Sequence, residues 1–181
     1  MWCTMNTAID DDFYEIQRLA TLGFWEKIDG ILDSNSQLIN HRDSFGGNLL
    51  VYLSAYPGAY RTIKKLIAEG AEVNIVTSDG ESPITKALLG GEKFGESTKD
   101  IISLLISNNL ELNFIGPSGY PPLHWAIYHN KINYAKILLE SGADPYLKTN
   151  DLYPENAFDI AEEEKNHEAL SLLNSYKRKR D

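Results

Sequence analysis

Near-identical phrases recur along this chain at an interval of a little more than thirty residues. Three of them close at Asn40, Asn74 and Asn113, which are 34 and 39 residues apart, and a fourth closes at Tyr146, 33 residues further on. A fixed period in this range indicates a stacked repeat array, in which each unit buries its apolar face against its neighbours. Because such arrays commonly serve as scaffolds for binding, the first functional question is what partner this one holds.

Each phrase carries helix-start and helix-stop signals in the same order. The clearest copy reads GYPPLHWA at 119–126 and GAD at 142–144, the one before it DGESPITKA at 79–87 and NLELN at 109–113, and a degenerate one DSFGGNLL at 43–50 and LIAEGAEVN at 66–74. Pro83 and Pro122 predict the first turns of short helices, where the missing N–H has no intrahelical partner, and Ser82 can cap one of them. Gly70 and Gly142 predict the ends of longer second helices, where a left-handed residue without Cβ fits.

These phrases resemble ankyrin repeats, whose turn, short helix, longer helix and Gly-Ala-Asp-x-Asn ending they follow. The resemblance implies an all-α solenoid of stacked helix-turn-helix units with turn or hairpin-like fingers. We expect an N-terminal extension over residues 1–9, one ankyrin-repeat domain over 10–175 and a basic tail over 176–181. The expected units are a cap at 10–40, repeats at 41–74, 75–113 and 114–146, and a second cap at 147–175.

Composition restricts the class of protein. The chain has 181 residues, 43% of them hydrophobic, which is the size of one domain with an extended core. It has no run of 18 apolar residues and no secretory signal at its start, and its single Cys3 excludes an internal disulfide. We therefore expect a cytoplasmic protein that is monomeric on its own and makes no membrane contact.

The charge of the chain favours a basic partner. The net charge is −9, and because residues 177–181 contribute +3, the remainder carries −12. An acidic surface repels nucleic-acid phosphates and attracts basic proteins, so we expect another protein, with a basic surface, and no nucleic acid. The acidic runs at 10–12 and 162–164 fit the polar outer faces that caps require. The basic run is either a nuclear signal, a patch-binding element or a solvated helix end, and the last is favoured.

The middle repeat contains an insertion. Ala87 and Leu105 are 18 positions apart, whereas the equivalent Ala126 and Leu138 are 12 apart, so six residues are extra. They lie within 90–98, where three glycines and polar residues predict a loop. Two interpretations remain open: a contact element with Phe94 as its anchor, or a tolerated surface expansion, since lengthening a loop has a small entropic cost.

Two patterns mimic chemical sites. The run HRD at 41–43, followed by Asn48, has the spacing of a protein-kinase catalytic loop, but no glycine-rich phosphate loop precedes it and no Asp-Phe-Gly follows. His124 occupies the Leu-His position of the ankyrin pattern, which implies a ring that ties one turn to the next. His124 and His129 are five apart and do not share a helix face as a metal pair would. We expect no enzyme activity, no catalytic residue, no cofactor and no metal site.

The resemblance also implies where a partner would bind. Ankyrin domains usually grip it with the turn tips and the exposed side of the short helices, which together form a concave face. Carried over position by position, and with Phe94 from the inserted loop, this selects Arg42, Phe45, Tyr56, Asp79, Glu81, Phe94, Tyr120, Tyr128, His129, Leu152 and Tyr153. A wider set adds Ser44, Val76, Ser78, Ile115, Pro117, Ser118, Asn150 and Glu155.

The aromatic members of this set predict an aromatic and acidic contact surface, because interfaces are enriched in Tyr and a few central aromatics dominate binding energy. The alternative is that some of the ten tyrosines only fill the scaffold. Trp125, beside His124, is expected to stack between repeats and to act on stability.

The leading hypothesis is a non-enzymatic protein–protein interaction module, a stoichiometric inhibitor or immunity-type protein that neutralises its partner through the concave face. The alternative is a bacterial effector or adaptor that binds a host or cellular protein without inhibiting it. An enzyme with a dispersed active site is the remote third reading.

Overall fold

The computed structural model describes residues 7–90, 96–116, 119–150 and 152–180, and all regular structure in them is helical. The helices are α1 (Thr7–Leu22), α2 (Trp25–Ser34), η1 (Ser36–Ile39), α3 (Leu49–Leu53), η2 (Pro57–Ala59), α4 (Tyr60–Ala68), α5 (Pro83–Gly90), α6 (Glu96–Ser107), α7 (Pro122–Tyr128), α8 (Ile132–Glu140), α9 (Ala157–Glu163) and α10 (His167–Arg180). None of these described helices is both long enough and apolar enough to cross a bilayer.

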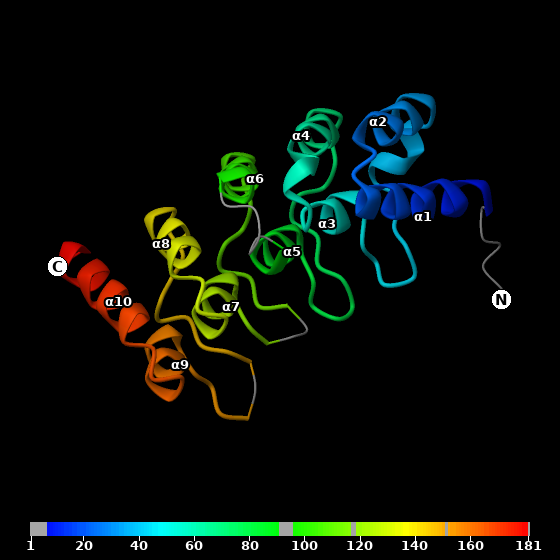
Figure 1. Cartoon of the computed structure of the whole chain (residues 1–181). Helices are drawn as coiled ribbons and strands as arrows, with labels where there is room; N and C mark the ends of the chain where they lie inside the picture. The colour runs from blue at the N-terminus through cyan, green and yellow to red at the C-terminus, as the bar shows by residue number, and fades with distance from the viewer. Residues whose placement is uncertain (1–6, 91–95, 117–118, 151, 181) are drawn as a thin grey trace. The chain divides into compact units, whose positions relative to one another are not determined.

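The helices belong to two compact units, residues 1–109 (unit 1) and 110–181 (unit 2). In unit 1 the first helices α1, α3 and α5 pack in one layer and α2, α4 and α6 in a second (Figure 1). In unit 2, α7 packs on α9 and α8 on α10, and each first helix also packs on the second helix that follows it. This arrangement confirms the predicted all-α solenoid of helix-turn-helix units.

Helix boundaries follow the local signals in the sequence. As predicted, α5 begins at Pro83 and α7 at Pro122, and Ser82 Oγ accepts a hydrogen bond from the Thr85 N–H at 3.3 Å. Gly70, with φ of 91°, and Gly142, with φ of 103°, follow α4 and α8 in the left-handed conformation. After α6 this place is taken by Asn109, with φ of 61°, because Asn tolerates the left-handed region better than other residues with a Cβ.

The periodic asparagines form hydrogen bonds between one repeat and the next. In unit 1 the Asn40 amide donates to the Gly70 carbonyl at 2.9 Å, and its oxygen accepts from the Glu72 N–H at 2.8 Å. Asn74 likewise donates to the Asn109 carbonyl at 2.9 Å. Gly70 and Asn109 lie two residues after the ends of α4 and α6. Each asparagine therefore binds the turn that follows a second helix one repeat further along the chain.

The same asparagine hydrogen bonds between repeats occur in unit 2, but the fourth phrase has a tyrosine in place of the asparagine. Asn113 donates to the Gly142 carbonyl at 3.5 Å and accepts from the Asp144 N–H at 2.8 Å. At the equivalent place in the next phrase stands Tyr146, whose ring instead stacks on Phe158 with centroids 5.5 Å apart. The interval between the phrases therefore corresponds to the spacing of the hydrogen bonds that join consecutive repeats.

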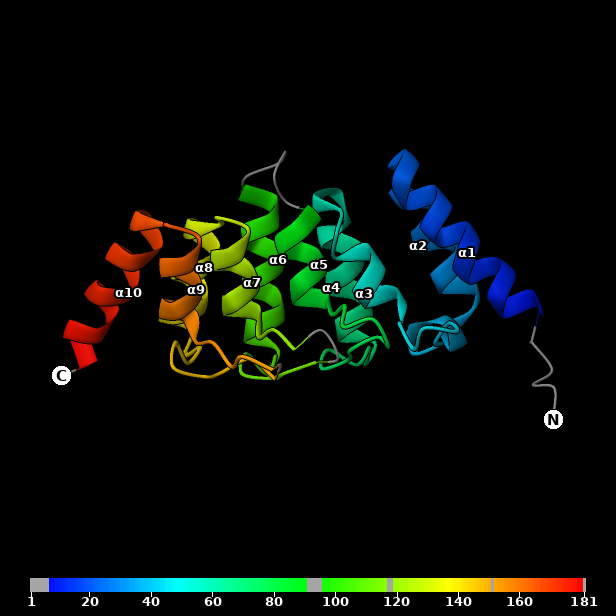
Figure 2. The same ribbon diagram turned by 90° about the horizontal axis from the view of Figure 1, so that it is seen from below.

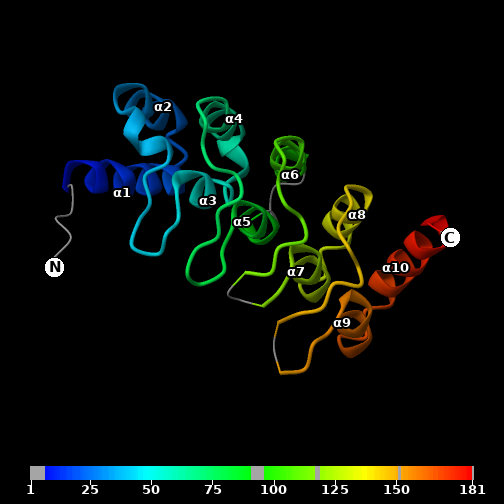
Figure 3. The same ribbon diagram turned by 180° about the vertical axis from the view of Figure 1, so that it is seen from behind.

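Fingers precede the first helices, and three of them close in the same way. One backbone N–H donates across the base of each finger: Asp43 to the Gly47 carbonyl at 3.0 Å, Thr77 to Glu81 at 2.8 Å and Thr149 to Glu155 at 2.8 Å. Neighbouring fingers within a unit are also bonded, Ser78 N–H to the Phe45 carbonyl at 2.9 Å and Asn150 N–H to the Gly119 carbonyl at 3.2 Å. Figure 2 shows the fingers of each unit at one end of its helices. In Figure 3 the finger before α9 extends to one side of that helix.

The kinase-like motif is structural, as interpreted from the sequence. The Asp43 carboxylate accepts hydrogen bonds from the N–H groups of Phe45 and Gly47, both at 3.0 Å, and from the Tyr52 hydroxyl at 2.6 Å. His41 lies 2.9 Å from a carboxylate oxygen of Asp10. Asp43 therefore shapes the finger turn.

The ends of the predicted domain differ slightly from the helix bounds. Helix α1 begins at Thr7, three positions before the expected start of the N-terminal cap at residue 10, and α10 continues to Arg180 through the expected tail. The division into three repeats and two caps stays a prediction.

Candidate partner-binding surface

Two of the charged residues predicted at the unit 1 fingers, Arg42 and Glu81, form ion pairs within unit 1. Arg42 forms an ion pair with Glu72, with side chains about half exposed, and Glu81 pairs with Lys86. Exposed ion pairs contribute about 0–1 kcal/mol. Each pair holds its two side chains in place, and the paired charges neutralise each other within unit 1.

A polar network continues from this pair into the interior. The Lys86 ammonium lies 5.9 Å from the centroid of the Tyr52 ring, and the Tyr52 hydroxyl donates to Asp43. Burial raises the pKa of Tyr52 well above its ordinary value, and the hydrogen bond to the Asp43 carboxylate acts in the same direction. The hydroxyl stays protonated and holds the finger to α3.

The remaining predicted residues of unit 1 divide between exposed and packed positions. Phe45, at the tip of its finger, is 54% exposed, and Asp79 is exposed on the next finger. Tyr56 is half-buried, with its ring centroid 6.1 Å from that of Trp25. Phe45 and Asp79 are therefore accessible to a partner, whereas Tyr56 also supports the packing of α2.

Unit 2 brings three of the predicted residues into one aromatic cluster. The Tyr120 ring centroid lies 6.5 Å from that of Tyr128 and 5.9 Å from that of Trp125. His129 stacks on Trp125 at 5.0 Å, with ring planes 4° apart, and meets the edge of Tyr128 at 5.1 Å. Tyr128 is 52% exposed. Trp125, which was expected to act first on stability, thus also contacts residues predicted to bind.

The cluster also contains polar atoms that folding leaves unsatisfied. Trp125 Nε1 and His129 Nε2 are buried, and neither forms a hydrogen bond among the residues that the structure describes. A buried polar group without a partner costs about 1–3 kcal/mol, and most such groups are paired. This cost is concentrated on α7, next to exposed aromatic surface.

His124 is part of the scaffold. Its side chain is fully buried, and burial lowers its pKa, while the nearby backbone of Leu147 and Glu155 acts in the opposite sense. Neither ring nitrogen has a hydrogen-bond partner among the described residues. Leu147 and Glu155 belong to the segment before α9, so the ring lies between consecutive repeats of unit 2. Among the described residues, no group of three potential metal-ligating side chains occurs.

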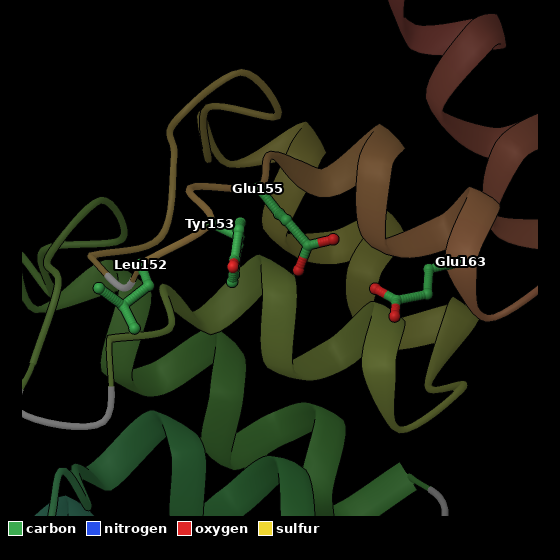
Figure 4. Close-up of a pocket in the computed structure, with 4 residues that line it drawn as sticks. All are labelled: Leu152, Tyr153, Glu155 and Glu163. Carbon is green, nitrogen blue, oxygen red and sulfur yellow. The ribbon is translucent and has the colours of Figure 1, made fainter.

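Beside this cluster lies a pocket of about 450 Å³, lined by Leu152, Tyr153, Glu155 and Glu163 (Figure 4). Leu152 is 92% exposed and Tyr153 83% exposed, the two largest exposures among the large hydrophobic side chains described. The first three lining residues come from the finger before α9, and Glu163 is the last residue of α9. The pocket thus combines apolar groups with two carboxylates.

The cluster and the pocket occupy equivalent positions on adjacent repeats. Helices α7 and α9 pack against each other, and in the repeat register Glu155 corresponds to Tyr120 and Glu163 to Tyr128. We call this set the α7/α9 surface: Tyr120, Trp125, Tyr128, His129, Leu152, Tyr153, Glu155 and Glu163. Glu163 was missed in the sequence because its acidic run was interpreted as the solvated face of a cap.

Some predicted residues cannot be placed. Phe94, Pro117 and Ser118 lie outside the described residues. The two interpretations of the inserted loop therefore stay predictions.

Comparison with known proteins identifies the family. The model of the ankyrin repeats, which spans three copies, matches residues 50–149. The chain belongs to the ankyrin-repeat family. The predicted resemblance is confirmed over these residues, which include helices of both units.

Relatives in three organisms match parts of this chain. A putative ankyrin repeat protein of Acanthamoeba polyphaga mimivirus is 31% identical over 65% of this chain and 70% of its own length. A putative ankyrin repeat protein of Borreliella burgdorferi is 33% identical over 54% of this chain and 41% of its own. The protein benign gonial cell neoplasm of Drosophila melanogaster is 42% identical over 33% of this chain, but only 5% of its own length is matched. Ankyrin repeats indicate a protein–protein interaction module, in a family that is generally non-enzymatic.

Proposed function

We propose that this chain binds a partner protein stoichiometrically through the α7/α9 surface. The observation that carries the proposal is the concentration of exposed aromatic and apolar side chains there, with Leu152 92%, Tyr153 83% and Tyr128 52% exposed. Large apolar groups gathered at one place on a protein surface mark interaction sites, and aromatic anchors tend to dominate their binding energy.

The contrast between the two units supports this choice of surface. In unit 1, Arg42, Glu81 and Lys86 are matched by neighbouring charges. In unit 2, buried ring nitrogens of Trp125 and His129 have no hydrogen bond among the described residues, and the neighbouring Tyr128 is 52% exposed. The ion pairs of the first surface are formed within the chain, with Phe45 and Asp79 still exposed. The second surface presents more exposed aromatic and apolar side chains to a partner.

We further propose that binding neutralises the partner, in the manner of an inhibitor or immunity-type protein. Residues 110–176 carry ten acidic and four basic side chains, a net charge of −6. Such a surface accelerates encounter with a basic protein and blocks the basic surface that it covers. An adaptor or effector would use the same surface while leaving the partner active.

Affinity capture with three matched baits tests the proposal. Wild-type chain, Tyr128→Ala and Tyr146→Ala are used on extracts of the source organism, because Tyr128 and Tyr146 are both 52% exposed and only Tyr128 belongs to the α7/α9 surface. We expect one protein that wild type and Tyr146→Ala retain and Tyr128→Ala loses.

The captured protein is then assayed with and without the chain. Inhibition that saturates at one chain per partner supports neutralisation, and full activity in the complex assigns the adaptor role instead. Equal capture by all three baits contradicts the α7/α9 surface as the binding site.

A further inference from the structure

We propose that the pocket lined by Leu152, Tyr153, Glu155 and Glu163 receives an arginine side chain of the partner protein. The inference rests on the proposed function and adds the chemistry by which the partner is recognised. An arginine fits because its planar guanidinium pairs with carboxylates and stacks on aromatic rings at the same time.

The walls of the pocket supply both kinds of contact. Glu155 precedes α9 and Glu163 ends it, and in Figure 4 the Glu155 carboxylate lies between the side chains of Tyr153 and Glu163. The pocket volume of about 450 Å³ is large enough to admit an arginine side chain. The carboxylates of Glu155 and Glu163 form ion pairs with the guanidinium cation, and the Tyr153 ring stacks on it.

The position of the acidic run is unfavourable for folding alone. Helix α9 ends at Glu163, its last turn contains no basic residue, and Glu162 and Glu164 flank that glutamate. A helix C-terminus carries partial negative charge, so carboxylates there are destabilising. Even with Lys165, residues 162–165 keep a net charge of −2. The run therefore concentrates negative potential beside the pocket, where a bound cation offsets the repulsion.

The apolar rim makes this charge more effective. Leu152 and Tyr153 are the most exposed large hydrophobic side chains described, and both stand at the edge of the pocket. Apolar groups next to a charge lower the local dielectric constant and strengthen its pairing with an opposite charge. They also cover the methylene stem of an arginine, which is itself apolar.

A displayed library of random peptides provides a defined probe that does not depend on knowing the partner. Full-length chain is panned against the library, and the affinities of the selected peptides are measured by fluorescence anisotropy. We expect the selected peptides to share an arginine whose replacement by citrulline, a neutral isostere, weakens binding about tenfold.

Charge-matched variants locate the site. Glu163→Gln is expected to weaken the selected peptides about five- to tenfold and to reduce the salt dependence of binding. Glu168→Gln makes the same charge change at an exposed position on α10 outside the pocket, and is expected to leave affinity unchanged.

Three results would overturn the inference: no selected peptide, selected peptides without a required cation, or equal binding by Glu163→Gln and wild type. Self-association of the chain that disappears when the basic residues of 177–180 are neutralised would place a second copy in the pocket instead. If the captured partner is lost by Tyr128→Ala but not by Glu163→Gln, the proposed function stands and the arginine pocket fails. If neither substitution affects the partner, the proposed function fails.

Discussion

At Gly90 the end of α5 approaches the segment after α3 so closely that no side chain fits between them. A Cβ built on Gly90 would lie 2.1 Å from the carbonyl oxygen of Ala55 and 2.7 Å from its Cα. Both atoms are backbone, so rotation of a side chain cannot relieve the contact. Gly30, inside α2, is the matched opposite: no heavy atom lies within 4 Å of its built Cβ.

These two positions predict opposite changes in the free energy of unfolding. Replacing a helical glycine by alanine ordinarily stabilises by about 0.5–1 kcal/mol, because alanine loses less backbone entropy. Overpacking costs about 1–3 kcal/mol, and contact with backbone at this separation belongs at the upper end. We therefore expect Gly30→Ala to stabilise by about 0.5–1 kcal/mol, and Gly90→Ala to destabilise by about 2 kcal/mol after its gain in helix propensity is subtracted.

Urea unfolding followed by far-ultraviolet circular dichroism measures both variants against wild type. The dependence of the free energy on urea should be unchanged, so that shifts in midpoint report stability alone. A Gly90→Ala variant that is as stable as wild type, or that gains as much as Gly30→Ala, would refute the close packing of α5 on the segment that follows α3.

Three further predictions address the periodic asparagines, the buried histidine and the aromatic cluster. Asn40→Ala removes two hydrogen bonds between repeats and should destabilise by about 2 kcal/mol in urea unfolding; a change within a few tenths would contradict the stabilising role of these bonds. Because burial lowers the pKa of His124 below its ordinary 6.5, the unfolded chain binds the proton more readily. Stability should therefore fall as pH falls below that value, by at most about 1.4 kcal/mol per pH unit. In a pH series of thermal midpoints, wild type should lose more stability below that pH than the His124→Gln control, whose other titratable groups are unchanged; equal slopes would count against it. Tyr120→Ala should lower the thermal midpoint more than Tyr128→Ala, because Tyr120 packs on Trp125 and Tyr128 is half exposed; the reverse order in scanning calorimetry would be inconsistent with this packing.

The parts of the fold that depend on local chemistry were predictable. Pro83 and Pro122 mark helix starts and Gly70 and Gly142 follow helix ends, because the missing N–H and the missing Cβ act within a few residues of their own position. Asn109 was missed as the equivalent of these glycines, since asparagine adopts the left-handed conformation without being the usual residue for it.

Contacts between repeats were not predictable from local signals. The period pointed to Asn40 as a recurring residue, but its hydrogen bonds to Gly70 and Glu72 join positions 30 and 32 residues away. The pairing of Arg42 with Glu72 spans 30 residues as well. Opposite charges separated by one repeat are a signal that could have indicated this pair in advance.

Most of the α7/α9 surface was selected from the sequence. The ankyrin register selected six of its eight residues, Tyr120, Tyr128, His129, Leu152, Tyr153 and Glu155. The stacking of Trp125 on His129 could have been found from their separation of four positions. Glu163 could not, because a run of glutamates near a terminal repeat fits a solvated face equally well. Only the finger before α9 places that carboxylate beside Leu152 and Tyr153.

The most direct test of the account is a calorimetric titration of the captured partner with wild-type chain, Tyr128→Ala and Tyr146→Ala. The two tyrosines are equally exposed, at 52%, so loss of apolar surface is the same in both variants. We predict a one-to-one complex that Tyr146→Ala preserves and Tyr128→Ala weakens by about 2 kcal/mol. Equal affinity of the two variants would contradict the assignment of partner binding to the α7/α9 surface.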